Sequence, residues 1–326
     1  MTESPARIIR ASVVQTCTQA YSLEHTLVKL EQLTRLARNR DGSQLAVFPE
    51  AFIGGYPKFS TFGAVVGTRS PQGREEYLRY HKAAIEVPSA TTARIEALAK
   101  ETGVFLVIGV IEKEPNGGTL YCTAIFVSPS LGLVGKHRKL QPTASERLIW
   151  GQGDGTTLQV HESDFSPSSS PGAPPIPVKI SAAICWENYM PLLRYHYFSH
   201  GTQIYCAPTV DARDDWQHSM SHIALEGRCF VLSACQFAQV QHYPADHALN
   251  PDQPDASRND PEDVMIAGGS MIVSPLGKIL AGPLRGQEGV LTAELDMDDI
   301  IRGKFDLDVV GHYARPDIFK FQANVD

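Results

Sequence analysis

Val178-Lys-Ile-Ser-Ala-Ala-Ile-Cys185, followed by Trp186-Glu-Asn-Tyr-Met-Pro191, is the stretch that most strongly predicts the fold. Segment 178–185 is almost continuously apolar, which is typical of a strand in a sheet that is covered on both faces. A polar turn follows, and Pro191 suits the first turn of a helix. This order predicts that the Cys185 thiol lies at the carboxyl edge of a sheet, where α/β folds bind ligands. A helix N-terminus near the thiol would favour its thiolate form.

The rest of the chain alternates between strand-like and helix-like segments. Leucines at 23, 27, 30 and 33 recur at the helical period, and segment 91–100 is a second helix candidate. Further apolar runs that predict strands occupy 7–15, 45–48, 104–111, 124–127, 204–206, 230–234 and 271–273. Interleaved strands and helices indicate an α/β fold. The Ser/Pro-rich stretch 163–177 and the polar stretch 241–263 are expected to be irregular loops of a single domain spanning 1–326.

Composition and charge exclude several classes of protein. The chain has 326 residues and a formal net charge of −7, with no run of Lys or Arg, so nucleic-acid binding is not expected. No apolar run approaches the ~18 residues of a membrane-spanning helix. The N-terminal residues lack the order of a secretory signal, so we expect a cytoplasmic protein. The six cysteines form no CxxC pair and are expected to be free thiols, most of them buried.

Three polar residues at predicted strand ends are candidates for chemistry. Cys185 ends one apolar strand, and Glu50 directly follows another, Leu45-Ala-Val-Phe-Pro49. A thiol can act as a nucleophile and a partly buried carboxylate as its base, but a core cysteine and a loop glutamate fit the same patterns. Lys139 could stabilise developing negative charge or lie in a solvated basic turn.

A second carboxylate, Glu146, stands seven residues after Lys139 and has the same ambiguity. Its simplest role is an ion pair with Lys139 or Arg147.

Two histidine pairs raise the alternative of a metal site. His196/His200 and His218/His222 are each spaced i, i+4, so each pair shares a helix face. Neither pair lies in an HExxH motif, and no carboxylate spacing completes a zinc set. The glycine-rich stretch 151–155 matches no phosphate-binding loop. We therefore expect neither a metal nor an organic cofactor, and keep a metal hydrolase as a remote alternative.

Four separated segments together carry a family resemblance. They are LAVFPEAFIGGYP at 45–57, HRKLQPTASERLIWGQGDG at 137–155, AAICWENYMPLLR at 182–194 and GKFDLDVVGHYARPDIF at 303–319. In this order they resemble the nitrilase superfamily of carbon–nitrogen hydrolases, and specifically its true nitrilase branch. The resemblance implies a catalytic Glu–Lys–Cys triad of Glu50, Lys139 and Cys185, with Glu146 as the second glutamate. It also implies a four-layer αββα sandwich.

The resemblance implies an activity and a mode of assembly as well. The expected reaction is hydrolysis of an organic nitrile to a carboxylic acid and ammonia, through a thioimidate and then a thioester on Cys185. Tyr56 and Trp186 either line the substrate pocket or are packing aromatics. The family forms dimers and larger spiral oligomers, for which residues of about 300–326 would be the oligomerisation tail. A cyanide hydratase or an amidase on the same scaffold remains an alternative, and a non-catalytic assembly protein a remote one.

Two features depart from the family pattern. Gly54-Gly55-Tyr56-Pro57 replaces the more usual PGYP, and the Ser/Pro-rich stretch before the Cys185 strand is longer than is typical. Both affect the rim of the site, so they bear on the choice of substrate more than on the chemistry.

Overall fold

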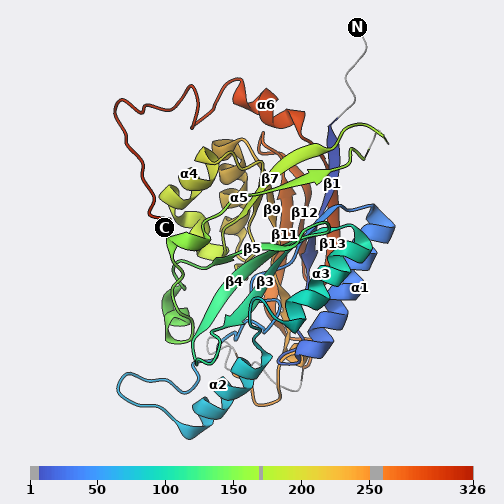
Figure 1. Cartoon of the computed structure of the whole chain (residues 1–326). Helices are drawn as coiled ribbons and strands as arrows, with labels where there is room; N and C mark the ends of the chain where they lie inside the picture. The colour runs from blue at the N-terminus through green and yellow to red at the C-terminus, as the bar shows by residue number, and fades with distance from the viewer. Residues whose placement is uncertain (1–6, 169–171, 250–259, 326) are drawn as a thin grey trace.

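Two mixed β-sheets form the centre of the computed structural model, which describes residues 7–168, 172–249 and 260–325 (Figure 1). The strands of the first sheet are, in spatial order, β13 (Gly289–Asp296), β1 (Ile8–Gln15), β2 (Leu45–Val47), β3 (Phe105–Lys113), β4 (Leu120–Ser128) and β5 (Gly132–Arg138). Strands β1, β2 and β3 are parallel, and the strands outside them pair antiparallel.

The second sheet repeats this plan. Its strands are, in order, β10 (Phe237–Gln239), β11 (Val264–Val273), β9 (Phe230–Ser233), β8 (Ile204–Cys206), β7 (Ile176–Ala182) and β6 (His161–Phe165), with β12 (Ile279–Arg285) also paired to β11. Strands β7, β8 and β9 are parallel. Each sheet therefore has a parallel centre, whose strands all end at the same edge.

Helices cover the outer face of each sheet. The first sheet is covered by α1 (Leu23–Asp41) and α3 (Ala90–Thr102), and the second by α4 (Pro191–Ser199) and α5 (Asp214–Gly227) (Figure 1). The remaining helices are α2 (Pro71–Ala83), α6 (Asp298–Lys304) and the short 3₁₀ turns η1 (Ala144–Leu148), η2 (Gly155–Thr157), η3 (Cys185–Tyr189) and η4 (Val240–His242). The predicted four-layer αββα sandwich is confirmed.

Local signals in the sequence set the ends of α1. The Ser22 side chain accepts a hydrogen bond from the His25 N–H, and Gly42 ends the helix in the left-handed conformation with φ +66°. A residue with a side chain is disfavoured at such a φ, so glycine suits this position. Leu27 and Leu30 are buried on the face toward the first sheet, which is the face that the leucine period predicts.

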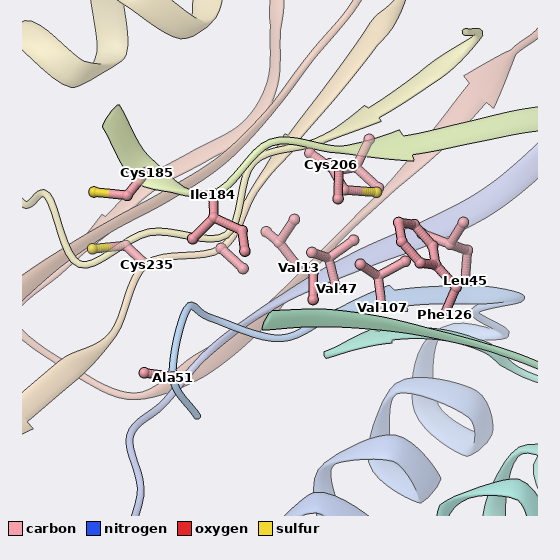
Figure 2. Close-up of a cluster of buried hydrophobic side chains, with 14 of the residues drawn as sticks. Val13, Leu45, Val47, Ala51, Val107, Phe126, Ile184, Cys185, Cys206 and Cys235 are labelled. Atoms are coloured by element: carbon pink, nitrogen blue, oxygen red, sulfur yellow. The ribbon is translucent and has the colours of Figure 1, made fainter. Parts of the chain in front are cut away.

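The main core lies between the two sheets and extends to the predicted site. Val13, Val47 and Val107 from the first sheet pack in one cluster with Ile184 and Cys185, which directly follow β7 of the second sheet (Figure 2). Figure 2 shows Cys185 at one end of this cluster, where strands give way to loops. The nucleophile candidate is therefore held by the same packing that holds the sheets together.

Two expectations about segment boundaries are wrong. In the stretch 163–177, residues 163–165 belong to β6 and 176–177 to β7, which pair antiparallel. Strand β6 lies at the sheet edge, where Glu162 and Asp164 are exposed to solvent. Pro177 lies near the start of β7, where proline is tolerated. The strand expected over 178–185 ends at Ala182, because Cys185 turns into η3.

The stretch 241–263 lies partly outside the described residues, at 250–259. Its described part is irregular as expected, apart from the last residues of η4. Within the described ranges, no helix is long and apolar enough to cross a membrane.

Candidate active site

Three chain segments carry the predicted residues to one end of the sandwich. Glu50 follows β2, Lys139 follows β5, and Cys185 follows β7. Strand β5 runs in the same direction as β2, because two antiparallel steps separate β3 from β5. Glu50 and Lys139 therefore emerge at the same edge of the first sheet, where Cys185 reaches them from the second.

The ammonium of Lys139 bridges two carboxylates. Its Nζ donates to Glu50 Oε1 at 2.7 Å and to Glu146 Oε2 at 2.8 Å. Glu146 also accepts from the Tyr56 hydroxyl, at 2.8 Å, and from the Thr143 N–H, at 2.6 Å. Glu50 is 0% exposed and Lys139 1%, so neither is the solvated loop residue that its local pattern also allowed.

Glu146 pairs with Lys139 rather than with Arg147. The Arg147 side chain instead donates to the backbone carbonyl of Ala144.

Electrostatics prepare Glu50 to accept a proton. Burial raises the pKa of its carboxyl, the Lys139 ammonium opposes that rise, and the negative charge of Glu146 adds to it. The net result is a raised pKa, which suits a base that works near neutral pH. Glu50 Oε2 has no hydrogen-bond partner among the described residues, and the Cys185 thiol interacts with this carboxyl. Burial lowers the pKa of Lys139, but Glu50 and Cys185 outweigh burial, so the ammonium stays protonated.

Cys185 is held in a sharp turn. Its φ of +52° lies in the left-handed region, which is unusual for a residue with a side chain and clusters at functional sites. The Cys185 N–H donates to the Pro208 carbonyl at 2.9 Å, and the Asn188 side chain donates to the Cys185 carbonyl at 2.7 Å. Ala51, directly after Glu50, has the same φ of +52°.

The expectation that a helix N-terminus favours the thiolate is wrong. Burial first, and the negative charge of Glu50 second, raise the pKa of Cys185 well above its ordinary value, although Lys139 opposes them. Helix α4 begins only at Pro191, beyond the short η3 turn. Burial outweighs the attraction of the Lys139 ammonium, so the thiol needs a base to ionise.

A buried pair that sequence reasoning missed joins the two sides of the site. Glu187 accepts from the Leu140 N–H and from the Ile184 N–H, each at 2.7 Å. Both of its oxygens also lie within 3.1 Å of His137 Nε2. Leu140 follows Lys139 and Ile184 precedes Cys185, so one carboxylate connects the two segments. The sequence carried no signal for this pair beyond the presence of Glu187 beside Cys185.

A cavity of about 430 Å³ opens onto Cys185. Tyr56 and Trp186 both line it, and Val210, Met265 and Ile266 add apolar surface. Both aromatics also contact the rest of the protein, so each of them lines the cavity and packs as a structural aromatic at the same time. Tyr56 packs edge-on against Trp150, and the Trp186 indole N–H donates to Asp211 Oδ2 at 2.9 Å.

The histidine pairs do not assemble a metal site in the described ranges. His196 Nε2 lies 3.1 Å from the Leu158 carbonyl, and His200 Nδ1 lies 2.8 Å from the His196 carbonyl. In the second pair, His222 lies 4.0 Å from Glu226, which is bound to Arg194.

One group among the described residues has the spacing of a metal site, namely Cys17, His242 and Glu288. The Lys29 ammonium already contacts Glu288, and burial raises the pKa of Cys17 to about 12. A cation therefore already pairs with the carboxylate, and the thiol is protonated, so these residues fit a metal ion poorly.

The geometry permits attack by a cysteine on an electrophilic carbon, with a base and a cation beside the sulfur. Residues 10–305 match the model of the carbon-nitrogen hydrolase family. An arylacetonitrilase of Trametes versicolor is 67% identical over 317 residues, which cover 97% of each protein. Nitrilase 1 of Arabidopsis thaliana is 46% identical over 323 residues, covering 98% of this chain and 88% of that protein. The chain therefore belongs to the carbon–nitrogen hydrolase family, and within it to the nitrilase branch.

Solved structures agree on the fold. An amidase from Nesterenkonia sp. superposes with a TM-score of 0.61 over 93% of this chain and 97% of that chain, at 18% identity. At this identity the likeness concerns the fold alone.

Proposed function

We propose that the protein is a nitrilase whose nucleophile is Cys185. Glu50 takes the thiol proton, and the sulfur adds to the nitrile carbon while the electron pair of the C–N π bond moves to nitrogen. Glu50 then delivers the proton that it took from the thiol to this nitrogen, which gives a thioimidate and returns Glu50 to its carboxylate form. Lys139 stabilises the charge that develops there, and Glu146 holds Lys139 in place. The observation that carries the proposal is the buried Lys139 ammonium between Glu50 and Glu146, beside Cys185.

The second half of the reaction uses the same groups. Glu50 removes a proton from a water molecule, which adds to the thioimidate carbon, and ammonia leaves to give a thioester. A second water molecule, activated in the same way, releases the carboxylic acid and returns the thiol. The raised pKa of Glu50 allows it to accept and return protons near neutral pH.

We propose arylacetonitriles as the substrate class. The name of the Trametes versicolor relative, which is 67% identical, supports this class. The cavity also supports it, because its apolar lining and the half-exposed Trp186 offer an aromatic substrate a surface to pack on.

Ammonia release from a panel of arylacetonitriles, aliphatic nitriles, amides and cyanide tests the proposal. The purified protein should prefer arylacetonitriles, and Cys185→Ala should lose at least about 1,000-fold in kcat. Rapid quench and mass spectrometry should find the acyl adduct on Cys185. Cys206→Ala, at another buried cysteine, should keep the activity.

Undiminished turnover by Cys185→Ala would contradict the mechanism. Turnover of amides alone would indicate an amidase, and formamide from cyanide would indicate a cyanide hydratase.

We further propose that residues 1–326 form one domain and that the tail of about 300–326 mediates self-association. Ile300 packs in the core between the sheets, which supports a single domain. Beyond it, Tyr313 and Phe319 are 64% and 75% exposed, beside Leu192 of α4, which is 70% exposed. Apolar side chains this exposed favour burial against a second copy.

A cytoplasmic location is our proposal as well. It is supported by the six cysteines, all of which are described and free, as expected in a reducing compartment.

A further inference from the structure

A second side chain contacts the sulfur of Cys185 from the neighbouring strand. Thr209 lies three residues beyond the end of β8 and is fully buried. Its backbone N–H donates to the Ala234 carbonyl at 2.9 Å, which continues the pairing of β8 with β9. Thr209 Oγ1 lies 3.2 Å from Cys185 Sγ. The position of this hydroxyl is therefore set by the sheet rather than by a loose loop.

The donor in the Thr209–Cys185 hydrogen bond can be identified from the other hydrogen bonds of the Thr209 hydroxyl. A hydroxyl carries one proton and can accept through its lone pairs. The Asp211 N–H donates to Thr209 Oγ1 at 2.9 Å, which leaves the Thr209 proton free to point at the sulfur. Asp211 is fixed in turn, because its carboxylate accepts from Arg213 and from the Trp186 indole. The hydroxyl is thus oriented as a donor to Cys185 Sγ before substrate arrives.

We propose that Thr209 is a catalytic residue that stabilises the negative charge of Cys185 sulfur, both as the attacking thiolate and as the leaving thiolate. When Glu50 takes the thiol proton, the sulfur gains a full charge, and the Thr209 hydrogen bond becomes charge-assisted and stronger. When the tetrahedral thioester adduct collapses, the C–S bond breaks and its electron pair returns to sulfur. The Thr209 proton remains on its own oxygen throughout.

The hydrogen bond has opposing effects on the attack step. It raises the fraction of thiolate but lowers the nucleophilicity of each thiolate, and the second effect is about half as large on a logarithmic scale. The net effect is faster attack. The rate at which the sulfur leaves is raised with no opposing effect, because a stabilised thiolate leaves more readily.

Thr209→Val tests the proposal, because valine keeps the shape and removes the donor. The apparent pKa for alkylation of Cys185 by iodoacetamide, followed on its peptide by mass spectrometry, should rise by about one unit. The value of kcat/KM for a nitrile should fall about 3- to 10-fold, with more acyl-enzyme trapped by rapid quench. Thr209→Ser keeps the donor and should recover most of the lost rate.

Other groups act on the same sulfur and are unchanged in these variants. They are Glu50 after β2, Lys139 after β5, Glu146 in η1, Tyr56 in the loop after β2 and Cys235 after β9. The matched control is Thr202→Val, which removes a buried hydroxyl at the other end of β8, where it donates to Ser181. This control should lower the melting temperature without moving the alkylation profile. Where Thr209→Val does not fold, Thr209→Ala replaces it in the same assays.

An alkylation profile of Thr209→Val that matches the unmodified protein would overturn the proposal. A shift of equal size in Thr209→Ser would overturn it too, because serine retains the donor. The role of Thr209 in turnover rests on the proposed nitrilase function, but alkylation needs no nitrile. A shifted alkylation profile in Thr209→Val, in a protein that turns over no nitrile, would therefore support the Thr209–Cys185 hydrogen bond and contradict the proposed nitrilase function.

Discussion

Buried charges that compensate one another are the main feature of the site at the scale of single residues. Glu50 and Lys139 are fully buried, and Glu146 nearly so, yet each has an oppositely charged partner within 2.8 Å. Breaking such a pair by removing one partner costs about 3–5 kcal/mol, because a charge is left buried and alone. Substitutions of these residues change stability as well as reaction rate. The stability of each variant therefore has to be measured together with its activity.

Glu187→Gln is predicted to remove a pH-dependent part of the stability. Burial raises the pKa of Glu187, but His137 and the N–H groups of Leu140 and Ile184 outweigh burial and hold it below the ordinary value of 4.5. A carboxyl with a depressed pKa stabilises the fold above its unfolded pKa, and the effect is lost as pH falls through the folded pKa. At pH 7 the variant should lose about 2 kcal/mol of unfolding free energy, measured with urea.

The difference in unfolding free energy between Glu187→Gln and the unmodified protein should become smaller below about pH 4. Glu101→Gln is the matched control, because Glu101 is an exposed carboxylate paired with Arg35. Its substitution should change the unfolding free energy far less than Glu187→Gln does. A constant difference at all pH values would mean that the charge of Glu187 is not the cause.

At the scale of elements, the site depends on how closely the turn that carries Glu50 approaches β3. A Cβ built on Gly109 of β3 would lie 2.1 Å from the Pro49 carbonyl oxygen, 2.6 Å from Glu50 Cα and 2.8 Å from the Ala51 nitrogen. All three are backbone atoms of the turn, so they have no flexible end that could move aside. Glycine at this position therefore sets where Glu50 lies.

Gly109→Ala is predicted to displace Glu50. The added methyl group should cost about 1–3 kcal/mol of stability through overpacking. It should also lower kcat/KM at least about tenfold, because small misplacements of catalytic groups are costly. Gly118→Ala, in the turn after β3, is the control, since a Cβ there meets nothing within 4 Å. Equal activity of the two variants would show that the approach of the turn is not critical.

At the scale of the whole molecule, apolar side chains stay exposed on α4 and on the chain beyond α6. The chain beyond α6 runs outside the second sheet to α4, where Phe321 packs edge-on against Tyr195 (Figure 1). A groove of about 480 Å³ between them is lined by Leu192, Tyr313 and Phe319 among others. A face of this kind is where we expect copies of the chain to meet.

If copies of the chain associate through this groove as proposed, Leu192→Glu combined with Phe319→Glu should separate them. Two carboxylates would have to be desolvated in the contact, so the molar mass from light scattering should fall toward the monomer value of 35.7 kDa. Leu131→Glu, at an equally exposed leucine between β4 and β5, should leave the mass unchanged. An unchanged mass in the double variant would place the interface elsewhere.

The sequence by itself predicted the parallel central strands of both sheets and the helices α1, α3 and α4, because the periods of apolar residues depend on neighbours in the chain. No local pattern predicted α2, α6, β10, β12 or β13. The sequence also identified Glu50, Lys139, Glu146 and Cys185 through separated motifs, and the structure brings these four together.

Only the tertiary structure decided the protonation of Cys185 and the partners Thr209 and Glu187. Burial and a base 135 positions away in the chain raise the pKa of the thiol. Glu187 likewise pairs with His137, 50 positions earlier, and Thr209 with Cys185, 24 positions earlier. Desolvation and contacts between distant segments arise only when the sheets pack together, and no local pattern in the chain records them.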